Sequence, residues 1–288
     1  MPVDLIVVPY DSGHRGRRMG AGPLRFVECG AAERLRAVAG GVRETVVGAE
    51  LELPAEIATA FELARATAFA ARSARGRGSL PLVLAGNCIT SLGVLAALPP
   101  QGTGIVWLDA HGDLNTPETT RSGMLDGMAL STALGRCWGR LARGIDGFEP
   151  VPEECVLLVG ARDLDAGEQH ELECSRVMSL TPDEARDGQQ LASRLVSLEK
   201  CVERVYLHVD LDVHAPGEGL ANTFQPPGGL TAGEVSDVVR TVADRIPIVA
   251  AAITAYDPAA DADGRMLAIG LELMELIAEL SVTAHEGT

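Results

Sequence analysis

Residues Trp107-Leu108-Asp109-Ala110-His111-Gly112-Asp113-Leu114-Asn115 join an apolar run to three side chains that can bind metal ions. The run Gly104–Leu108 predicts a buried strand. Asp109, His111 and Asp113 therefore lie at or just beyond its carboxyl end. Side chains two residues apart share one face of an extended chain, so two carboxylates and an imidazole would converge. Such a set suits a divalent cation such as manganese or zinc. The alternative is a strand end with ordinary solvated polar residues.

Apolar runs typical of strands alternate with helical patterns along the whole chain. The expected strands are Asp4–Tyr10, Thr45–Leu51, Leu80–Cys88, Gly104–Leu108, Cys155–Gly160, Val177–Leu180, Arg204–Asp212 and Ile246–Tyr256. Helices are expected from about Pro23 and over Ala55–Ala74, Ile89–Ala97, Met128–Leu134, Ala166–Glu173, Leu191–Glu199, Thr231–Arg245 and Gly264–Leu280. This alternation predicts an α/β fold over residues 1–288: a single three-layer domain with a parallel sheet of about eight strands, covered by helices on both faces.

Charge and composition narrow the classes of function. The formal net charge is −16, with 24 Lys and Arg against 40 Asp and Glu. Because such a field repels phosphate backbones and anionic lipid surfaces, we expect no nucleic-acid and no membrane partner. The N-terminal residues lack the features of a signal peptide, and no apolar run approaches the roughly 18 residues that span a bilayer. We therefore expect a cytoplasmic location, with most of the six cysteines reduced.

A second motif, His208-Val209-Asp210-Leu211-Asp212, supplies the partner that the first one needs. Asp210 and Asp212 alternate on one face of a predicted strand, and ligands of parallel sheets bind at the carboxyl ends of strands. Together the two motifs offer five ligands, which is more than one tetrahedral site needs and suits two metal ions. His208 shares the face of Asp210, where it could support the ligands or be an ordinary hydrogen-bonded core histidine.

With these residues the sequence resembles the ureohydrolase superfamily of arginases, agmatinases and formiminoglutamases. The resemblance covers nearly the whole chain. It runs through Gly20–Arg25, Asp109–Pro117, Thr119–Gly123, Gly160–Glu168, Asp210–Asp212 and Gly228–Leu230. As a set these motifs are highly specific.

The resemblance implies a centre of two manganese ions per chain. Asp109 and Asp210 would bridge the ions. Asp113 would complete one ion and also act in catalysis, while His111 and Asp212 would complete the other. A hydroxide bridging the metals would attack the carbon of a guanidinium or related C=N group, and an amine would leave. The implied reaction is hydrolysis of a non-peptide C–N bond.

The resemblance also implies a small guanidino substrate with an amino-acid head group. Four residues align with those that bind such a head group in the family: Asn115, Ser122, Asp163 and Asp165. Oligomeric state stays open between a monomer and a homo-oligomer such as a trimer.

The first departure from the family pattern concerns a metal ligand. The usual Gly-Gly-Asp-His turn is Ala85-Gly86-Asn87-Cys88 here, so Cys88 stands where a histidine ligand is expected. A thiolate can bind a metal ion, but it is softer than imidazole and adds a negative charge. We expect Cys88 to be a ligand. The alternative is an inert thiol beside a weakened site.

Two further departures affect proton transfer and guanidinium binding. Asp126 replaces the shuttle histidine in Ser122–Gly127, and a carboxyl is a poor proton donor near pH 7 unless its pKa is raised. His214 is a candidate substitute. Ala255 stands where the family usually has a glutamate that pairs with the guanidinium. Asp257 or Glu168 could compensate, which makes Glu168 a further candidate for substrate binding.

The cysteine and the missing histidine resemble one branch of the superfamily, the Nω-hydroxy-L-arginine hydrolases of D-cycloserine biosynthesis. An N-hydroxyguanidine has a more acidic nitrogen and therefore needs less help from a proton donor. The expected products are hydroxyurea and L-ornithine. The alternatives are hydrolysis of another guanidine, amidine or formimino substrate, or a catalytically weak member that only binds a ligand.

Overall fold

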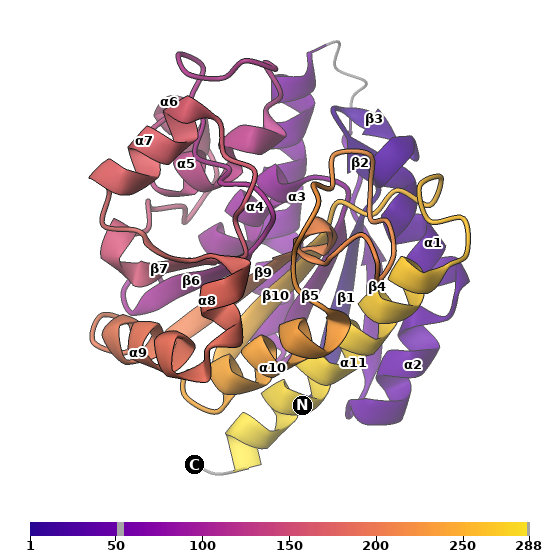
Figure 1. The fold of residues 1–288 in the computed structure, drawn as a ribbon. Coiled ribbons are helices and arrows are strands. Elements are labelled where there is room, and N and C mark those ends of the chain that lie inside the picture. The colour runs from indigo at the N-terminus through magenta and orange to yellow at the C-terminus, as the bar shows by residue number, and fades with distance from the viewer. Residues whose placement is uncertain (51–54, 287–288) are drawn as a thin grey trace.

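Eight parallel strands form one sheet in the computed structural model, which describes residues 1–50 and 55–286 (Figure 1). Their order is β4-β1-β5-β10-β9-β6-β7-β8. The strands are β1 (Val3–Val8), β4 (Val42–Val46), β5 (Leu80–Ala85), β6 (Thr103–Leu108), β7 (Val156–Val159), β8 (Met178–Leu180), β9 (Arg204–Asp210) and β10 (Ile248–Thr254). The predicted α/β fold with a parallel sheet is confirmed. β2 (Tyr10–Asp11) and β3 (His14–Arg15) form a small separate hairpin.

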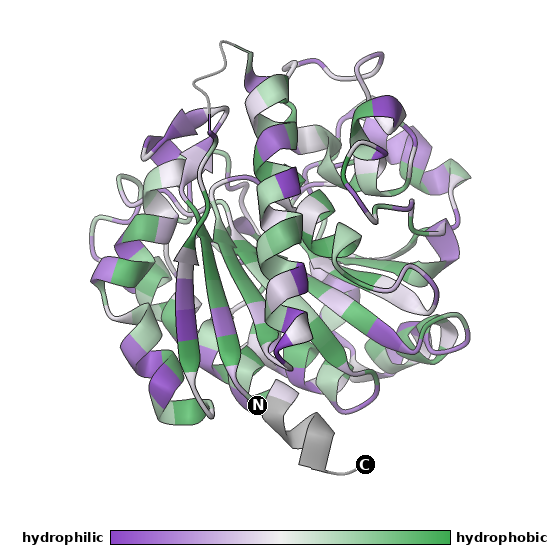
Figure 2. Cartoon of the chain, turned by 180° about the vertical axis from the view of Figure 1, so that it is seen from behind, coloured by the Kyte–Doolittle hydropathy of each residue, from purple (hydrophilic) through white to green (hydrophobic). Residues whose placement is uncertain are grey.

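Helices cover both faces of the sheet. In Figure 1 helices α9, α10 and α11 lie in front of it, and Figure 2 shows the long α3 crossing it from behind. The helices are α1 (Gly22–Glu28), α2 (Ala31–Val38), α3 (Glu56–Gly76), α4 (Ser91–Ala96), α5 (Ala129–Ala133), α6 (Gly139–Ala142), α7 (Ala166–Cys174), α8 (Pro182–Arg186), α9 (Gly188–Leu198), α10 (Ala232–Ala243) and α11 (Arg265–Glu286). Within the described residues, no helix is long and apolar enough to cross a membrane.

Continuous apolar runs explain why the central strands lie inside the molecule. Every residue of β1, β5 and β6 is buried, as expected for strands that pack against helices on both faces. Trp107 and Tyr206, on the neighbouring strands β6 and β9, are the largest fully buried side chains. The core is otherwise built mainly from Leu, Val, Ile and Ala.

Two element boundaries differ from the prediction for identifiable reasons. The second strand was predicted over Thr45–Leu51, but β4 covers Val42–Val46, and Leu51 lies outside the described residues. Because β4 is an edge strand whose residues are partly or fully exposed, it lacks the apolar pattern of the inner strands. The predicted helix from Pro23 is interrupted at Gly30, whose φ of 86° lies in the left-handed region and separates α1 from α2.

The topology brings the carboxyl ends of β5, β9 and β6 to the same end of the sheet. In the sheet order, β10 lies between β5 and β9, and β9 pairs with β6. The predicted strand end at Leu108 is confirmed by β6, but the expectation that the chain stays extended through Asp113 is wrong, because Asp113 has a left-handed φ of 51°. Likewise Asp212 lies in the 3₁₀ helix η5 (Leu211–Val213), so it does not share a strand face with Asp210. The directions of these side chains are therefore set by backbone turns and not by the alternation of side chains along a strand.

Candidate metal centre

A cavity of about 360 Å³ opens at the carboxyl ends of β5, β6 and β9. This volume suits a small-molecule ligand. Most of the predicted site residues line it: Cys88, His111, Asp113, Asn115, Ser122, Asp126, Asp163, Asp165, Glu168, Asp210 and Asp212. Residues separated by more than a hundred positions in the sequence therefore share one wall.

One half of the cluster is built from His111 and two carboxylates. The Nδ1 atom of His111 lies 3.4 Å from Asp109 Oδ1 and 3.3 Å from Asp212 Oδ2. The carboxylates are held by the backbone, since His111 N–H donates to Asp109 at 2.7 Å and Ala110 N–H donates to Asp212 at 3.2 Å. These three side chains offer ligand atoms within 4.8 Å of one another, which is suitable for one divalent ion.

The other half contains Cys88 and Asp210. Cys88 opens the 3₁₀ helix η2 (Cys88–Thr90) after β5, and its Sγ lies 3.2 Å from Asp210 Oδ2. The second oxygen of Asp210 accepts a hydrogen bond of 2.8 Å from the N–H of Asp212. Burial raises the pKa of the Cys88 thiol well above its usual range, and the charges of nearby carboxylates raise it further. A divalent cation would act in the opposite direction and favour the thiolate.

The buried carboxylates themselves indicate a missing positive charge. Burial raises the pKa of Asp113 and of Asp210 well above the usual range, and the charges of neighbouring carboxylates raise both further. Asp113 Oδ2 is buried and has no hydrogen-bond partner among the described residues. Unpaired buried carboxylates are costly unless a cation neutralises them. The donor set therefore fits two divalent ions, with oxygen and nitrogen around one and oxygen and sulfur around the other.

His111 and Asp212 form the one strongly charge-paired part of the cluster. Burial opposes the charged form of His111, but Asp212 and Asp109 raise the pKa of its imidazole far above the usual range. Burial would also raise the pKa of Asp212, yet the positive charge and hydrogen bond of His111 lower it to about 2. The carboxylates around His111 therefore attract positive charge, which a divalent cation bound to the neutral imidazole would also supply.

Asp126 lies at the cavity wall next to the Cys88 turn. Its Oδ1 accepts a hydrogen bond from Ile89 N–H at 3.1 Å, and its Oδ2 accepts one from Asn87 Nδ2 at 2.8 Å. Burial raises the pKa of Asp126 to about 7, although these two hydrogen bonds favour the ionised form. The carboxyl group can therefore hold or release a proton near neutral pH.

Three of the predicted substrate-binding residues form one network at the mouth. Asn115 Nδ2 donates to Asp165 Oδ2 at 3.1 Å, and Asp165 caps the first turn of α7 by accepting from Glu168 N–H at 3.0 Å. Glu168 is buried and accepts from Leu114 N–H at 3.2 Å, which ties α7 to the metal-binding loop. Asp163 and Ser122 are exposed on the rim, where they are free to meet a ligand.

Two predicted residues do not line the cavity. Asp109 is 1% exposed and lies beneath it, where Trp107 Nε1 donates to its Oδ2 at 3.0 Å. The structure does not bring His214 to the cavity, although it directly follows η5. His214 is fully buried, with Nδ1 2.9 Å from Leu211 O and Nε2 unpartnered among the described residues. It is therefore poorly placed to transfer protons.

Ala255 stands where a guanidinium-pairing carboxylate was expected, and its backbone is strained. Ala255 lines the cavity with a φ of 62°, and its carbonyl accepts a hydrogen bond of 2.9 Å from Asn222 Nδ2. Of the two expected compensating residues, Glu168 lines the cavity and Asp257 does not. Asp257 instead accepts a hydrogen bond from Ala259 N–H at 2.9 Å.

Several lining residues were not singled out from the sequence. They are Met19, Arg121, Met124, Gly127, Asn222 and Phe224. Asn222 Nδ2 also lies 3.4 Å from Asp212 Oδ2, so it joins the loop after β9 to a candidate ligand. No periodicity or metal-binding spacing surrounds Asn222, so only the folded loop reveals it. Arg121 directly precedes Ser122, and its position beside a predicted site residue could have drawn attention to it.

Comparison with known proteins places these features in a family. The model of the arginase family matches residues 1–278. The arginase of Bacillus caldovelox is 28% identical over 289 residues, which cover 95% of this chain and 96% of that protein. Its solved structure matches with a TM-score of 0.87 and covers 96% of this chain and 98% of that chain. An Nω-hydroxy-L-arginine amidinohydrolase of Streptomyces lavendulae is 32% identical over 194 residues, or 65% of each chain.

Proposed function

Because this chain belongs to the arginase family of metal-dependent hydrolases of guanidino C–N bonds, we propose that it converts Nω-hydroxy-L-arginine to hydroxyurea and L-ornithine. The observation that carries the proposal is the altered wall of the cavity, where Cys88 and Asp126 lie beside a cluster of buried carboxylates and Ala255 replaces a carboxylate. The similarity to a hydroxyarginine amidinohydrolase supports the same substrate.

Two manganese ions are the proposed cofactor. His111 and Asp212 would hold one ion, Asp113 and Cys88 would hold the other, and Asp109 and Asp210 would be shared between them. Carboxylate-rich sites suit manganese. When bound, such a pair of ions lowers the pKa of water and so supplies a nucleophile at neutral pH.

Asp126 is the proposed proton donor to the leaving nitrogen. With a pKa raised to about 7, its carboxyl group is partly protonated under neutral conditions, and Asn87 and Ile89 fix its orientation. Water adds to the guanidino carbon, the bond from that carbon to the ornithine nitrogen breaks, and this nitrogen gains a proton. A general acid works best when its pKa lies near the operating pH, so this carboxyl group is suited to the step.

Residues at the rim would select the amino-acid head group. Asp163 and Asp165 can pair with an ammonium group, and Asn115 and Ser122 can hydrogen-bond a carboxylate. At the other end of the cavity Ala255 offers no charge to a guanidinium. A buried guanidinium without a carboxylate is costly, whereas an N-hydroxyguanidine is more readily bound as a neutral group. These residues therefore favour hydroxyarginine over arginine.

Location and domain extent are part of the same proposal. All six cysteines are free thiols, which supports a reducing compartment, and we propose the cytoplasm. We also assign residues 1–288 to one metallohydrolase domain. Oligomeric state stays open between a monomer and a homo-oligomer.

A product assay tests the proposed substrate. The manganese-loaded protein is given L-arginine and Nω-hydroxy-L-arginine separately, and urea, hydroxyurea and ornithine are quantified. We expect hydroxyurea with kcat/KM at least tenfold above the value for urea formation. Equal or greater kcat/KM on L-arginine would contradict the proposal. The same assay on Cys88→Ser and Cys88→His tests the ligand, since full activity of Cys88→Ser would show that the sulfur is not needed.

A further inference from the structure

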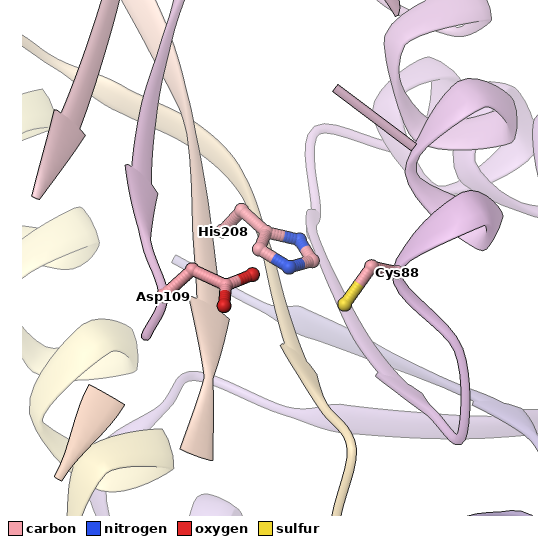
Figure 3. Close-up of side chains that lie close together, drawn as sticks. All are labelled: Cys88, Asp109 and His208. Carbon is pink, nitrogen blue, oxygen red and sulfur yellow. The ribbon is translucent and has the colours of Figure 1, made fainter. Parts of the chain in front are cut away.

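A second group of ligand atoms includes Cys88 from the cavity lining and two residues that do not line the cavity, Asp109 and His208. Cys88 Sγ, a carboxylate oxygen of Asp109 and a ring nitrogen of His208 all lie within 4.8 Å of one another. Figure 3 shows the His208 ring with the Asp109 carboxylate on one side and the Cys88 sulfur on the other. All three side chains are buried, with exposed fractions of 2%, 1% and 0%. His208 therefore faces the half of the centre that contains the thiol.

The ring of His208 is held in one orientation. It stacks on the indole of Trp107 with centroids 3.6 Å apart and an interplanar angle of 14°. Its Nδ1 lies 3.0 Å from both Ser91 Oγ and Tyr206 Oη, and these hydroxyls lie 2.7 Å from each other. Metal-binding histidines usually have the second ring nitrogen fixed by such a partner, which sets the tautomer and the direction of the ligating nitrogen. This arrangement leaves Nε2 as the ring nitrogen that could bind a metal ion.

The hydroxyl of Thr254 marks the space that Nε2 faces. Thr254 Oγ1 lies 3.3 Å from His208 Nε2 and 3.3 Å from Cys88 Sγ. It also lies 3.5 Å from the carbonyl of Val209, so it has another hydrogen-bond partner if it turns away. The two donor atoms are thus joined by a single small side chain that does not have to stay between them.

We propose that His208 is a ligand of the metal ion bound by Cys88, through Nε2. This inference rests on the proposed function, because it requires the chain to hold a metal centre. The ligands already proposed for this ion, Cys88 as a thiolate together with Asp113 and the shared carboxylates, are all anionic. The imidazole supplies a lone pair without charge. Sulfur and nitrogen ligands together also form a set typical of borderline metals such as zinc.

X-ray absorption of the zinc-loaded protein allows the imidazole ligands to be counted. The full-length protein is loaded with Zn²⁺ alone, freed of excess metal and measured by zinc K-edge X-ray absorption. A Zn–S distance of about 2.3 Å identifies the thiolate. Because carboxylate oxygens and ring nitrogens bind zinc at nearly the same distance, the imidazoles are counted from the outer-shell scattering of their rings. With two ions bound, the inference predicts an average of one imidazole per zinc, from His111 and His208. Without His208 the average is one half.

Two variants test whether His208 is one of the imidazole ligands. His208→Gln should lower the average to one half, while His170→Gln, which alters an exposed histidine on α7, should leave it at one. An average of one half in the wild type, or no change in His208→Gln, would overturn the role of His208 alone. Failure to bind stoichiometric zinc or manganese would overturn the proposed function as well.

Anomalous diffraction from zinc-loaded wild-type crystals covers the case in which His208→Gln does not fold. A zinc peak about 2.0–2.1 Å from His208 Nε2 would support the inference. A nearest peak beyond about 3 Å would overturn it. Normal ligation by His208 without hydrolysis of Nω-hydroxy-L-arginine by the manganese-loaded protein would instead contradict only the proposed substrate.

Discussion

Arg162 holds the loop that carries Asp212, and its replacement by methionine should destabilise the protein strongly. Its guanidinium lies within hydrogen-bond distance of six carbonyl oxygens, those of Gly160, Asp212, Val213, His214, Pro226 and Pro227, at 2.9–3.3 Å. The methionine side chain keeps a similar apolar stem but donates no hydrogen bond. Val213 O and His214 O would keep hydrogen bonds from Leu230 N–H and Gln225 Nε2, whereas the other carbonyls would lose the donor that Arg162 supplies.

The expected loss follows from the number of donors. A guanidinium has five N–H donors, and a hydrogen bond to a charged group contributes about 1.5–3 kcal/mol. Arg162 is only partly buried, so water can replace several of these bonds in Arg162→Met. Counting two of the five as lost at the lower limit gives a decrease of about 3 kcal/mol in the free energy of unfolding. With a urea m-value of about 3 kcal/mol/M, the midpoint should fall by roughly 1 M.

Urea unfolding followed by circular dichroism measures this change. Arg36→Met is the matched control, because among the described residues Arg36 pairs with Glu33 alone, with side-chain exposures of 52% and 72%. Such a pair contributes about 0–1 kcal/mol. If Arg162→Met unfolds within about 0.5 kcal/mol of the control, the carbonyl cluster does not stabilise this loop, and the reasoning is refuted.

Three other substitutions probe the cavity. Asp126→Asn should lower kcat about 100-fold, and it should remove the decline in wild-type kcat as pH rises through about 7, because only the protonated carboxyl donates. A wild-type pH–rate profile that stays flat through pH 7 would contradict this role. Ala255→Gly should raise the free energy of unfolding by about 1 kcal/mol in urea titrations, since it relieves a left-handed φ of 62°. An unchanged or lower value would show that this backbone is not strained. Ala255→Glu should lower KM for L-arginine roughly tenfold by supplying a carboxylate for its guanidinium. An unchanged KM would show that the cavity does not place the guanidinium there.

The strand pattern could be predicted because parallel strands buried on both faces are apolar throughout. This holds for β5 and β6, whose residues are all buried. It fails for β4, where solvent exposure on the sheet edge replaces hydrophobic residues with Arg43 and Glu44. The edge strand β4 is recognised by its hydrogen bonds to β1, and the residue composition of β4 does not predict these bonds.

The residue types of the metal centre were predictable, but their geometry was not. Spacing placed Asp109, His111 and Asp113 near one another, yet the chain turns after Leu108 and does not stay extended. The same kind of turn after β9 carries His214 away from the cavity. Asn222 enters from a loop whose path depends on tertiary contacts. Backbone turns determine which polar side chains lie close together. The two-residue spacing of these residues in the sequence does not predict such turns.

Metal content is the most direct test of the central claim that the buried carboxylates and Cys88 hold two manganese ions. The protein is stripped with a chelator, loaded with Mn²⁺, desalted and analysed for bound metal per chain. Asp113→Asn and Asp210→Asn serve as ligand variants. The account predicts two manganese ions per chain in the wild type and fewer in both variants. A wild-type protein that retains no manganese, or variants that retain as much as the wild type, would contradict it.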